Sequence, residues 1–200
     1  MGLTPVPRHE VATVVITLEM CERPQPRPMP PSPLRLTRWR EPAPARYRAL
    51  FRRVGEPWLW FSRLAMDEAR LVAIIHDPGV EIFAAEDRAG VEVGFLELDF
   101  RRAREAELSY FAFVPELAGK GHGRWLMAQA LQLAWKPGVE RVWVHTCTLD
   151  HPRALGFYRA QGFTAVSRTL ETFPDPRALG LLPESAAPHV PLLASRRDVA

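Results

Sequence analysis

Long uninterrupted apolar runs are missing from this sequence of 200 residues, although hydrophobic residues make up 47% of it. No stretch reaches the ~20 residues that a membrane-spanning helix needs. Residues 1–6 lack the basic stretch and apolar core of a secretory signal, and Val6 stands where a myristoylation signal needs Ser or Thr. We therefore expect a protein without membrane attachment and with a cytoplasmic location.

Cysteine is equally scarce, because Cys21 and Cys147 are the only two and cannot build a disulfide framework. An excess of one charge is also missing. The 26 basic and 23 acidic residues leave a formal net charge of +3, and the two kinds are interleaved: the arginines of residues 101–104 are answered by glutamates in 105–107. A massed basic surface is the footprint of nucleic-acid binding, so we expect no nucleic-acid partner.

Proline, by contrast, is concentrated in residues 23–33, which can therefore form neither a helix interior nor a sheet ladder. The preceding residues 11–20 are rich in Val, Ile and Thr and predict a strand. These patterns divide the chain into an N-terminal strand with a proline-rich connector over 1–33, one main domain over 34–173, and a loosely packed C-terminal tail over 174–200.

Within the main domain, hydrophobic periodicity predicts ten elements. In chain order these are a strand at 34–39, helices at 43–54 and 67–76, strands at 80–85, 91–100 and 106–114, a helix at 121–135, a strand at 141–146, a helix at 152–161 and a strand at 163–172. An antiparallel meander is thus followed by a βαβ unit. This order predicts an α/β (α+β) fold with a mixed, mostly antiparallel central sheet flanked by helices.

The most informative segment is the glycine-rich turn Gly119–Arg124, which lies between a strand and a helix. Glycines at alternate positions let a bulky ligand approach the backbone, and the free N–H groups of the first helical turn favour an anion. A dinucleotide fingerprint would need glycine where Arg124 stands, and a P-loop would end in Lys-Ser or Lys-Thr. A phosphate cradle of another kind and a plain helix-capping loop both remain open at this point.

Two segments resemble the GNAT superfamily of N-acetyltransferases. That family's signature is Gln or Arg, two residues, Gly, one residue, then Gly or Ala; it resembles residues 118–123, with Ala118 in place of the polar residue. A second family element, Asn-x-x-Ala-x-x-x-Tyr followed by Gly-Phe, resembles 151–158 and 162–163, with His151 in place of Asn. The resemblance covers roughly residues 34–172.

The resemblance implies that acetyl-CoA is the cosubstrate, with its pantetheine arm lying against the backbone of the fourth strand of the domain. Its pyrophosphate would take N–H groups from the glycine-rich turn. The cofactor-binding residues implied in this way are Phe113, Val114, Gly119, Lys120, Gly121, His122, Gly123, Arg124, His151 and Tyr158.

The chemistry expected is direct transfer of an acetyl group to a primary amine in a ternary complex, without a metal. The resemblance implies that Tyr158 protonates the departing thiolate and that Glu107 is the base, with Glu97 and Asp99 as substitutes. A backbone N–H, expected to be that of Val114, would stabilise the carbonyl oxygen as it becomes negative.

Other interpretations remain open. The chain could be a non-catalytic acyl-CoA-binding regulatory module, or a cysteine-dependent hydrolase using Cys147. His145, Cys147, Asp150 and His151 could form a thiol or metal site, although their spacing matches no standard ligand pattern. The aromatic run 58–61 fits either an acceptor wall or core packing. The identity of the amine acceptor is open, and a homodimer is one option for the assembly.

Overall fold

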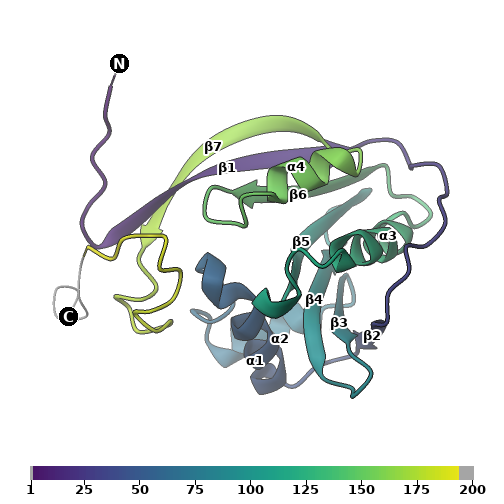
Figure 1. Cartoon of the computed structure of the whole chain (residues 1–200), viewed down its shortest axis with the longest axis horizontal. Coiled ribbons are helices and arrows are strands. Elements are labelled where there is room, and N and C mark those ends of the chain that lie inside the picture. Colours follow the sequence, from purple (N-terminus) through teal and green to yellow (C-terminus); the bar gives the residue numbers. More distant parts are fainter. Residues whose placement is uncertain (1, 194–200) are drawn as a thin grey trace.

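The computed structural model describes residues 2–193. Figure 1 shows a single curved sheet with helices against it. In chain order the elements are β1 (Glu10–Met20), β2 (Arg35–Trp39), α1 (Pro44–Gly55), η1 (Glu56–Trp58), α2 (Glu68–Ile75), β3 (Val80–Glu86), β4 (Glu92–Asp99), β5 (Glu105–Phe113), η2 (Pro115–Leu117), α3 (His122–Ala134), β6 (Arg141–Cys147), α4 (Ala154–Ala160) and β7 (Thr164–Pro174).

Local sequence accounts for the ends of these elements. The Asp67 side chain caps α2 by accepting the Arg70 N–H at 2.7 Å, and the helix stops before the turn at 77–79. Pro44 occupies the first turn of α1, where its missing N–H costs nothing. The elements expected from periodicity are found within two residues at most ends, so the predicted α+β fold is confirmed. No helix within residues 2–193 is both long and apolar enough to cross a bilayer.

The seven strands lie in the order β2-β3-β4-β5-β6-β1-β7. All neighbours are antiparallel except β5 and β6, which are parallel and paired only over Glu105–Glu107 and Arg141–Trp143. Beyond that short contact the two strands diverge, and α3 connects them. The sheet is therefore mixed, as the sequence predicts, and it opens in the middle at the carboxyl ends of β5 and β6.

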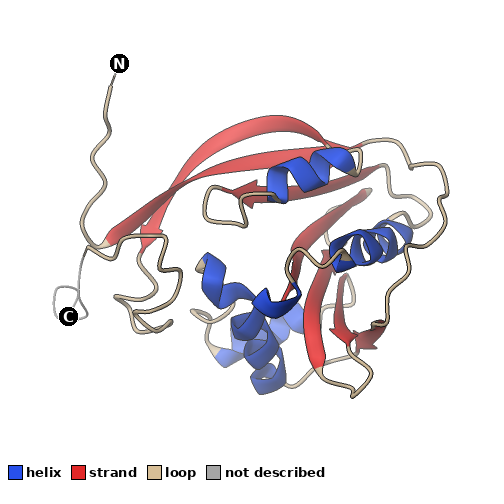
Figure 2. Cartoon of the chain, viewed as in Figure 1, coloured by secondary structure: helices blue, strands red, loops and turns tan. Residues whose placement is uncertain are grey.

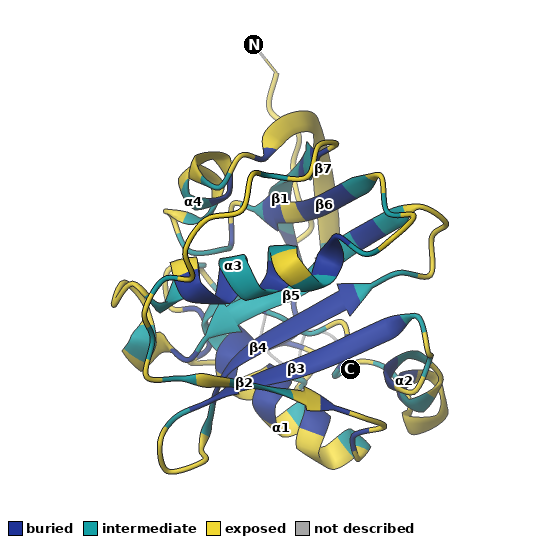
Figure 3. Cartoon of the chain, turned by 90° about the vertical axis from the view of Figure 1, so that its right-hand side faces the viewer, coloured by how far each residue is buried: buried dark blue, intermediate teal, exposed yellow. Residues whose placement is uncertain are grey.

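Each face of the sheet carries its own apolar core (Figures 2 and 3). On one face α3 and α4 bury Leu126, Met127 and Tyr158 against Leu96 and Leu108. On the other face α1 and α2 pack onto β3 and β4. That second core contains Tyr47, Leu50, Phe51, Leu71, Ile75, Ile82 and Phe95. Alternation along β3 and β4 supplies both cores from the same strands, which is why these two strands are almost entirely buried.

The first strand, β1, lies inside this sheet. Val15 pairs with Cys147 of β6 on one side and with Thr169 of β7 on the other. The sequence pattern places this strand outside the main domain, because the proline-rich connector follows it. The connector instead runs along the outside of the molecule and returns the chain to β2 at the opposite edge (Figure 1).

The segment 175–190 is packed, whereas the sequence predicts a loose tail from residue 174. Arg177 is 1% exposed, forms an ion pair with Asp175 at 2.7 Å, and donates to the carbonyl groups of Ala186 and Val190 at 3.1 and 2.8 Å. One buried guanidinium thus satisfies carbonyls that would otherwise lie unpaired, and it fixes the segment in place. The rest of the expected tail, residues 194–200, lies outside the described residues.

Candidate active site

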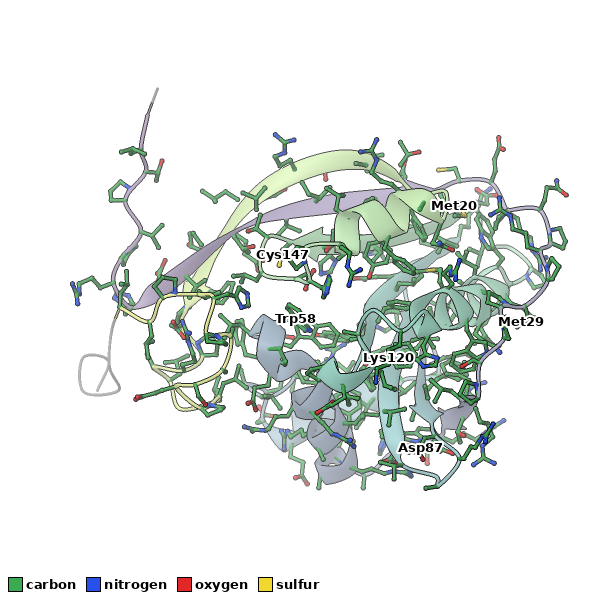
Figure 4. All side chains as sticks on the ribbon, viewed as in Figure 1. Met20, Met29, Trp58, Asp87, Lys120 and Cys147 are labelled. Carbon is green, nitrogen blue, oxygen red and sulfur yellow. The ribbon has the colours of Figure 1, made fainter. Side chains whose placement is uncertain are left out.

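A cavity of about 900 Å³ opens where β5 and β6 diverge. The glycine-rich turn and the start of α4 border one part of it, while η1, β1 and β7 border another. Trp58 and Cys147, labelled in Figure 4, both line it from different elements. The cavity therefore lies at the break in the parallel strand pair, a common place for ligands in α/β sheets.

The glycine-rich turn forms one wall through Gly119, Gly121 and Gly123. The first two have φ of 78° and 89°, in the left-handed region that favours glycine. Arg124 also lines the cavity, whereas the side chains of Lys120 and His122 do not. The Lys120 and Arg124 N–H groups donate to the carbonyls of Leu117 and Gly121, both at 3.3 Å, whereas those of His122 and Gly123 have no backbone acceptor within residues 2–193. This wall therefore presents the N–H groups of His122 and Gly123 and the positive end of the helix dipole.

The backbone of β5 presents further donors. The Val114 N–H already donates to the Val93 carbonyl at 2.9 Å, so it is not free to stabilise an oxyanion. Hydrogen bonding alternates along an antiparallel strand, which turns the backbone groups of Phe111 and Phe113 toward β6. The β5–β6 pairing ends at Glu107, so the backbone groups of Phe111 and Phe113 have no strand partner on that side within residues 2–193, and both residues line the cavity. The amides turned toward the cavity are therefore those of Phe111 and Phe113 rather than that of Val114.

Helix α4 and the turn before it supply Tyr158, His151 and Arg153 to the same cavity. Burial, with a smaller contribution from the charge of Asp150, raises the pKa of Tyr158 well above its usual value. The Tyr158 hydroxyl has no hydrogen-bond partner among residues 2–193. The Arg153 guanidinium lies over the glycine-rich turn, with Nη2 3.0 Å from where a Cβ on Gly119 would stand.

Glu107 lies one strand position short of the cavity and does not line it. Its carboxylate is 3.5 Å from Nδ1 of His145, which does line the cavity and is 48% exposed. Burial, with a smaller contribution from Asp99, raises the pKa of Glu107 to about 7. The two side chains together form an acid–base pair with its imidazole facing the cavity. The sequence gives no sign of this pairing, because it depends on the register between β5 and β6.

The two substitute carboxylates are committed to other contacts. Glu97 is fully buried, accepts a hydrogen bond from Tyr47 at 2.5 Å and forms an ion pair with Arg63 at 2.5 Å. Asp99 is held by Arg101 through both side-chain and backbone hydrogen bonds, which help to lower its pKa although partial burial acts in the opposite direction. Neither carboxylate lines the cavity.

Cys147 lines the cavity as a thiol rather than a thiolate. Burial and the nearby charge of Asp150 raise its pKa, so it is a poor nucleophile at neutral pH. Asp150 accepts hydrogen bonds from the Thr146 hydroxyl at 2.7 Å and the Cys147 N–H at 2.9 Å, which is a turn-forming role. Within residues 2–193, no group of three or more His, Cys, Asp or Glu side chains is arranged to hold a metal ion.

Aromatic side chains form the wall opposite α4. Trp58, Leu59, Trp60 and Phe61 all line the cavity, and Leu59 is also buried at 2% exposure. From the sequence the run 58–61 fits either wall or core; in the structure the whole run lines the cavity, and Leu59 also belongs to an apolar cluster. The sequence pattern did not indicate four further lining residues, which come from β1 and β7: Thr13, Val15, Glu171 and Phe173. The alternation of β7 could have placed the last two on one face, but nothing local indicates that this face borders the cavity.

The chain is similar to known acetyltransferases in sequence pattern and in fold. A family model described as "Acetyltransferase (GNAT) family" matches residues 47–163. No curated protein is significantly similar to the chain in sequence.

Several solved structures share the fold. A GCN5-related N-acetyltransferase from Sphaerobacter thermophilus is 19% identical with a TM-score of 0.53, over 81% of this chain and 51% of that one. A tandem GNAT protein from the clavulanic acid biosynthesis pathway is 19% identical with a TM-score of 0.53, over 82% and 53%. An aminoglycoside acetyltransferase from an uncultured soil metagenomic sample is 22% identical with a TM-score of 0.52, over 68% and 92%. The chain thus spans about half the length of the first two.

Proposed function

This chain belongs to the GNAT acetyltransferase family, and from that premise we propose that it transfers an acetyl group from acetyl-CoA to a primary amine. The observation that supports this most strongly is the geometry of the cavity. A glycine-rich turn at a helix N-terminus and the open backbone of β5 border one continuous space at the break between two parallel strands. Such a space fits a ligand with an extended amide-containing arm and a phosphate-bearing end.

The residues present fit acetyl-CoA at both ends. The pantetheine arm would pair with the backbone of β5 near Phe111 and Phe113, as an added strand does at a sheet edge. The pyrophosphate would take N–H groups of the glycine-rich turn. Ala118 offers no side-chain donor there, and we assign that role to Arg153, whose guanidinium lies over Gly119.

The reaction proposed has no covalent enzyme intermediate. The amine nitrogen attacks the thioester carbonyl carbon, the C–N bond forms and the C–S bond breaks, giving an amide and CoA. A protonated amine cannot attack, so His145 accepts a proton on the amine's side with Glu107 beside it. A β5 amide donates to the carbonyl oxygen, and Tyr158 donates to the leaving sulfur. The proton taken from the amine returns to the CoA thiolate through solvent.

The first test is binding of acetyl-CoA to the purified protein. A ligand selective for the native state stabilises it by about 2.7 kcal/mol at 100 times its Kd, so the Tm should rise by several degrees in a thermal melt. S-acetylpantetheine, which lacks phosphates, should produce a clearly smaller shift at the same concentration. No shift with acetyl-CoA at millimolar concentration would contradict the proposal.

A second prediction tests the glycine-rich turn. Gly123→Val should weaken acetyl-CoA binding by roughly 10-fold or more, because charge-assisted hydrogen bonds to a phosphate would be blocked. A Cβ at this position meets the Phe157 ring only at ordinary contact distance, 3.5 Å, and Gly123 lacks the positive φ of Gly121. Folding should therefore be preserved.

Calorimetric titration and a thermal melt of the same preparation separate the two effects. Gln132→Val, at an exposed position of the same helix, controls for the β-branched side chain. Equal affinity in folded Gly123→Val and wild type would mean that the phosphates bind elsewhere.

The alternative of a non-catalytic acyl-CoA-binding module predicts the same thermal shift. Release of CoA in the presence of amines separates the two, since acetyl-CoA would stabilise a binding module, yet no CoA would be released. The His145–Glu107 pair at the cavity favours the enzyme, because a binding module has no need of a carboxyl whose pKa lies near neutrality.

A further inference from the structure

One part of the cavity is bordered by β1 and β7, strands that the family model does not cover. Thr13 of β1 pairs with Glu171 of β7, and both line the cavity together with Phe173. Glu171 and Phe173 are two residues apart on one strand, so their side chains share a face. The family match ends at residue 163. If the proposed function holds, the acceptor binds in this part.

Aromatic rings dominate this acceptor region. The rings of Phe61 and Phe173 lie 4.9 Å apart, and those of Trp60 and Tyr110 lie 5.0 Å apart. All four residues are partly exposed and line the cavity. Such faces stabilise a flat apolar body by burial and by ring–ring contact. They offer few partners for the hydroxyl groups of a sugar.

The charge of the acceptor region is negative. Glu171 is exposed and makes no ion pair or side-chain hydrogen bond within residues 2–193. The arginines that line the cavity, Arg124 and Arg153, both lie by the glycine-rich turn and the start of α4. The second lining carboxylate, Asp150, already accepts hydrogen bonds from Thr146 and Cys147. An ammonium group entering between β7 and η1 therefore meets the uncommitted carboxylate of Glu171 and several aromatic faces, both of which attract a cation. A single uncommitted carboxylate is a poor match for a polycation.

The C-terminal segment holds the aromatic wall in place. Leu182, Ala186 and Ala187 bury Leu59, which lies between the wall residues Trp58 and Trp60. The buried Arg177 ties that segment to its own carbonyls. The wall is thus preorganised, which lowers the entropy lost when a rigid ligand binds.

We propose that the acceptor is a monoamine whose amino group is carried on an apolar aromatic body. Phe61 and Phe173 hold the ring, and Glu171 attracts the ammonium group before it loses its proton. This proposal rests on the acetyl-transfer function proposed above and adds the substrate class.

The experiment compares 2-phenylethylamine with ethylamine, which has the same amino group without the ring, and with spermidine and kanamycin. Initial rates of CoA release are measured at saturating acetyl-CoA. Burial of a phenyl ring should raise kcat/KM for 2-phenylethylamine roughly 10- to 100-fold over ethylamine. The two polycationic amines should be poorer than 2-phenylethylamine.

Variants locate the effect. Phe173→Ala should reduce the preference for 2-phenylethylamine over ethylamine by roughly 10-fold. Glu171→Gln should raise KM for both monoamines. Leu170 lies on the same strand, is 58% exposed and does not line the cavity. Leu170→Ala should therefore change neither the preference for 2-phenylethylamine nor KM for the two monoamines.

Two results separate this inference from the proposed function. An enzyme that is stabilised by acetyl-CoA but prefers spermidine, kanamycin or ethylamine over 2-phenylethylamine would overturn the aromatic acceptor and keep the acetyltransferase. A protein that neither binds acetyl-CoA nor releases CoA with any amine would overturn both.

Discussion

Replacement of Tyr158 by Phe is expected to lower kcat by roughly 10²-fold while acetyl-CoA affinity and Tm stay nearly unchanged. The hydroxyl reaches the cavity from α4 and has no partner within residues 2–193. Its ring is 7% exposed and contacts the rings of Phe111 and Phe163, contacts that Phe would keep. A hydrogen bond to a charged group contributes about 1.5–3 kcal/mol, which corresponds to the loss expected.

The raised pKa of Tyr158 defines how this hydroxyl can act. A tyrosine that holds its proton more tightly than usual cannot transfer it completely to a thiolate, whose own pKa is about 8.5. It can donate a hydrogen bond to sulfur as charge develops, and it remains a donor across the working pH range. The contribution then belongs to the transition state, so kcat and kcat/KM for the amine should fall equally.

Steady-state kinetics, a thermal melt and an acetyl-CoA titration of the same preparation test this role. Phe163→Leu is the matched control, since it disturbs packing around the Tyr158 ring but keeps the hydroxyl. That variant should lose stability, by about 1 kcal/mol, and retain kcat. Activity of Tyr158→Phe close to that of wild type would mean that CoA leaves as an unassisted thiolate.

The elements of the fold could be predicted because each is specified by its own residues. The alternation of residues 80–99 and the cap and stop of α2 lie within the elements that they define. The position of β1 could not be predicted in this way. Its partners, β6 and β7, lie more than a hundred residues further along the chain, and an apolar strand carries no local mark of which neighbour it will pair with.

The candidate site divides along the same line. Gly119, Gly121 and Gly123 could be identified from sequence because a turn before a helix is a local structure. Which β5 amide faces the cavity depends on the register with β4, and sequence reasoning selected Val114, whose N–H is bonded to Val93. Glu97 is a catalytic candidate by residue type and position on its strand, yet it is buried in an ion pair with Arg63 in the core. These outcomes are set by contacts between distant segments.

The acceptor region shows the same dependence on distant segments. Its wall joins residues 58–61 with Phe173 of β7, and a packed segment that follows β7 supports it. Proline and alanine in 174–193 suggest loose packing when counted as composition. The buried pair of Asp175 and Arg177 reverses that expectation, because two opposite charges two residues apart can satisfy each other and several carbonyls at once.

The last prediction concerns pH. Glu107→Gln should lower kcat roughly 10²-fold at pH 8, because His145, the proposed general base, loses the carboxylate beside it. In the wild type, burial raises the pKa of Glu107 to about 7, so the carboxyl is protonated below that pH and charged above it. A charged Glu107, 3.5 Å from Nδ1 of His145, attracts the proton that the imidazole accepts from the amine. Wild-type kcat should therefore fall as the pH is lowered through about 7.

In Glu107→Gln this dependence near pH 7 should disappear, because the glutamine has no proton to gain or lose. Glu105→Gln is the matched control: it lies two residues away on β5, faces Arg141 at 3.3 Å and does not line the cavity. It should keep both kcat and the fall near pH 7. Profiles of kcat against pH from 5.5 to 9.5, with amine and acetyl-CoA saturating, measure both effects. A profile of Glu107→Gln that still falls through pH 7 would assign that proton to another group. Glu107 would then act only on stability: a carboxyl whose pKa is raised in the folded state favours the native state most strongly at low pH and loses that contribution as the pH rises through about 7.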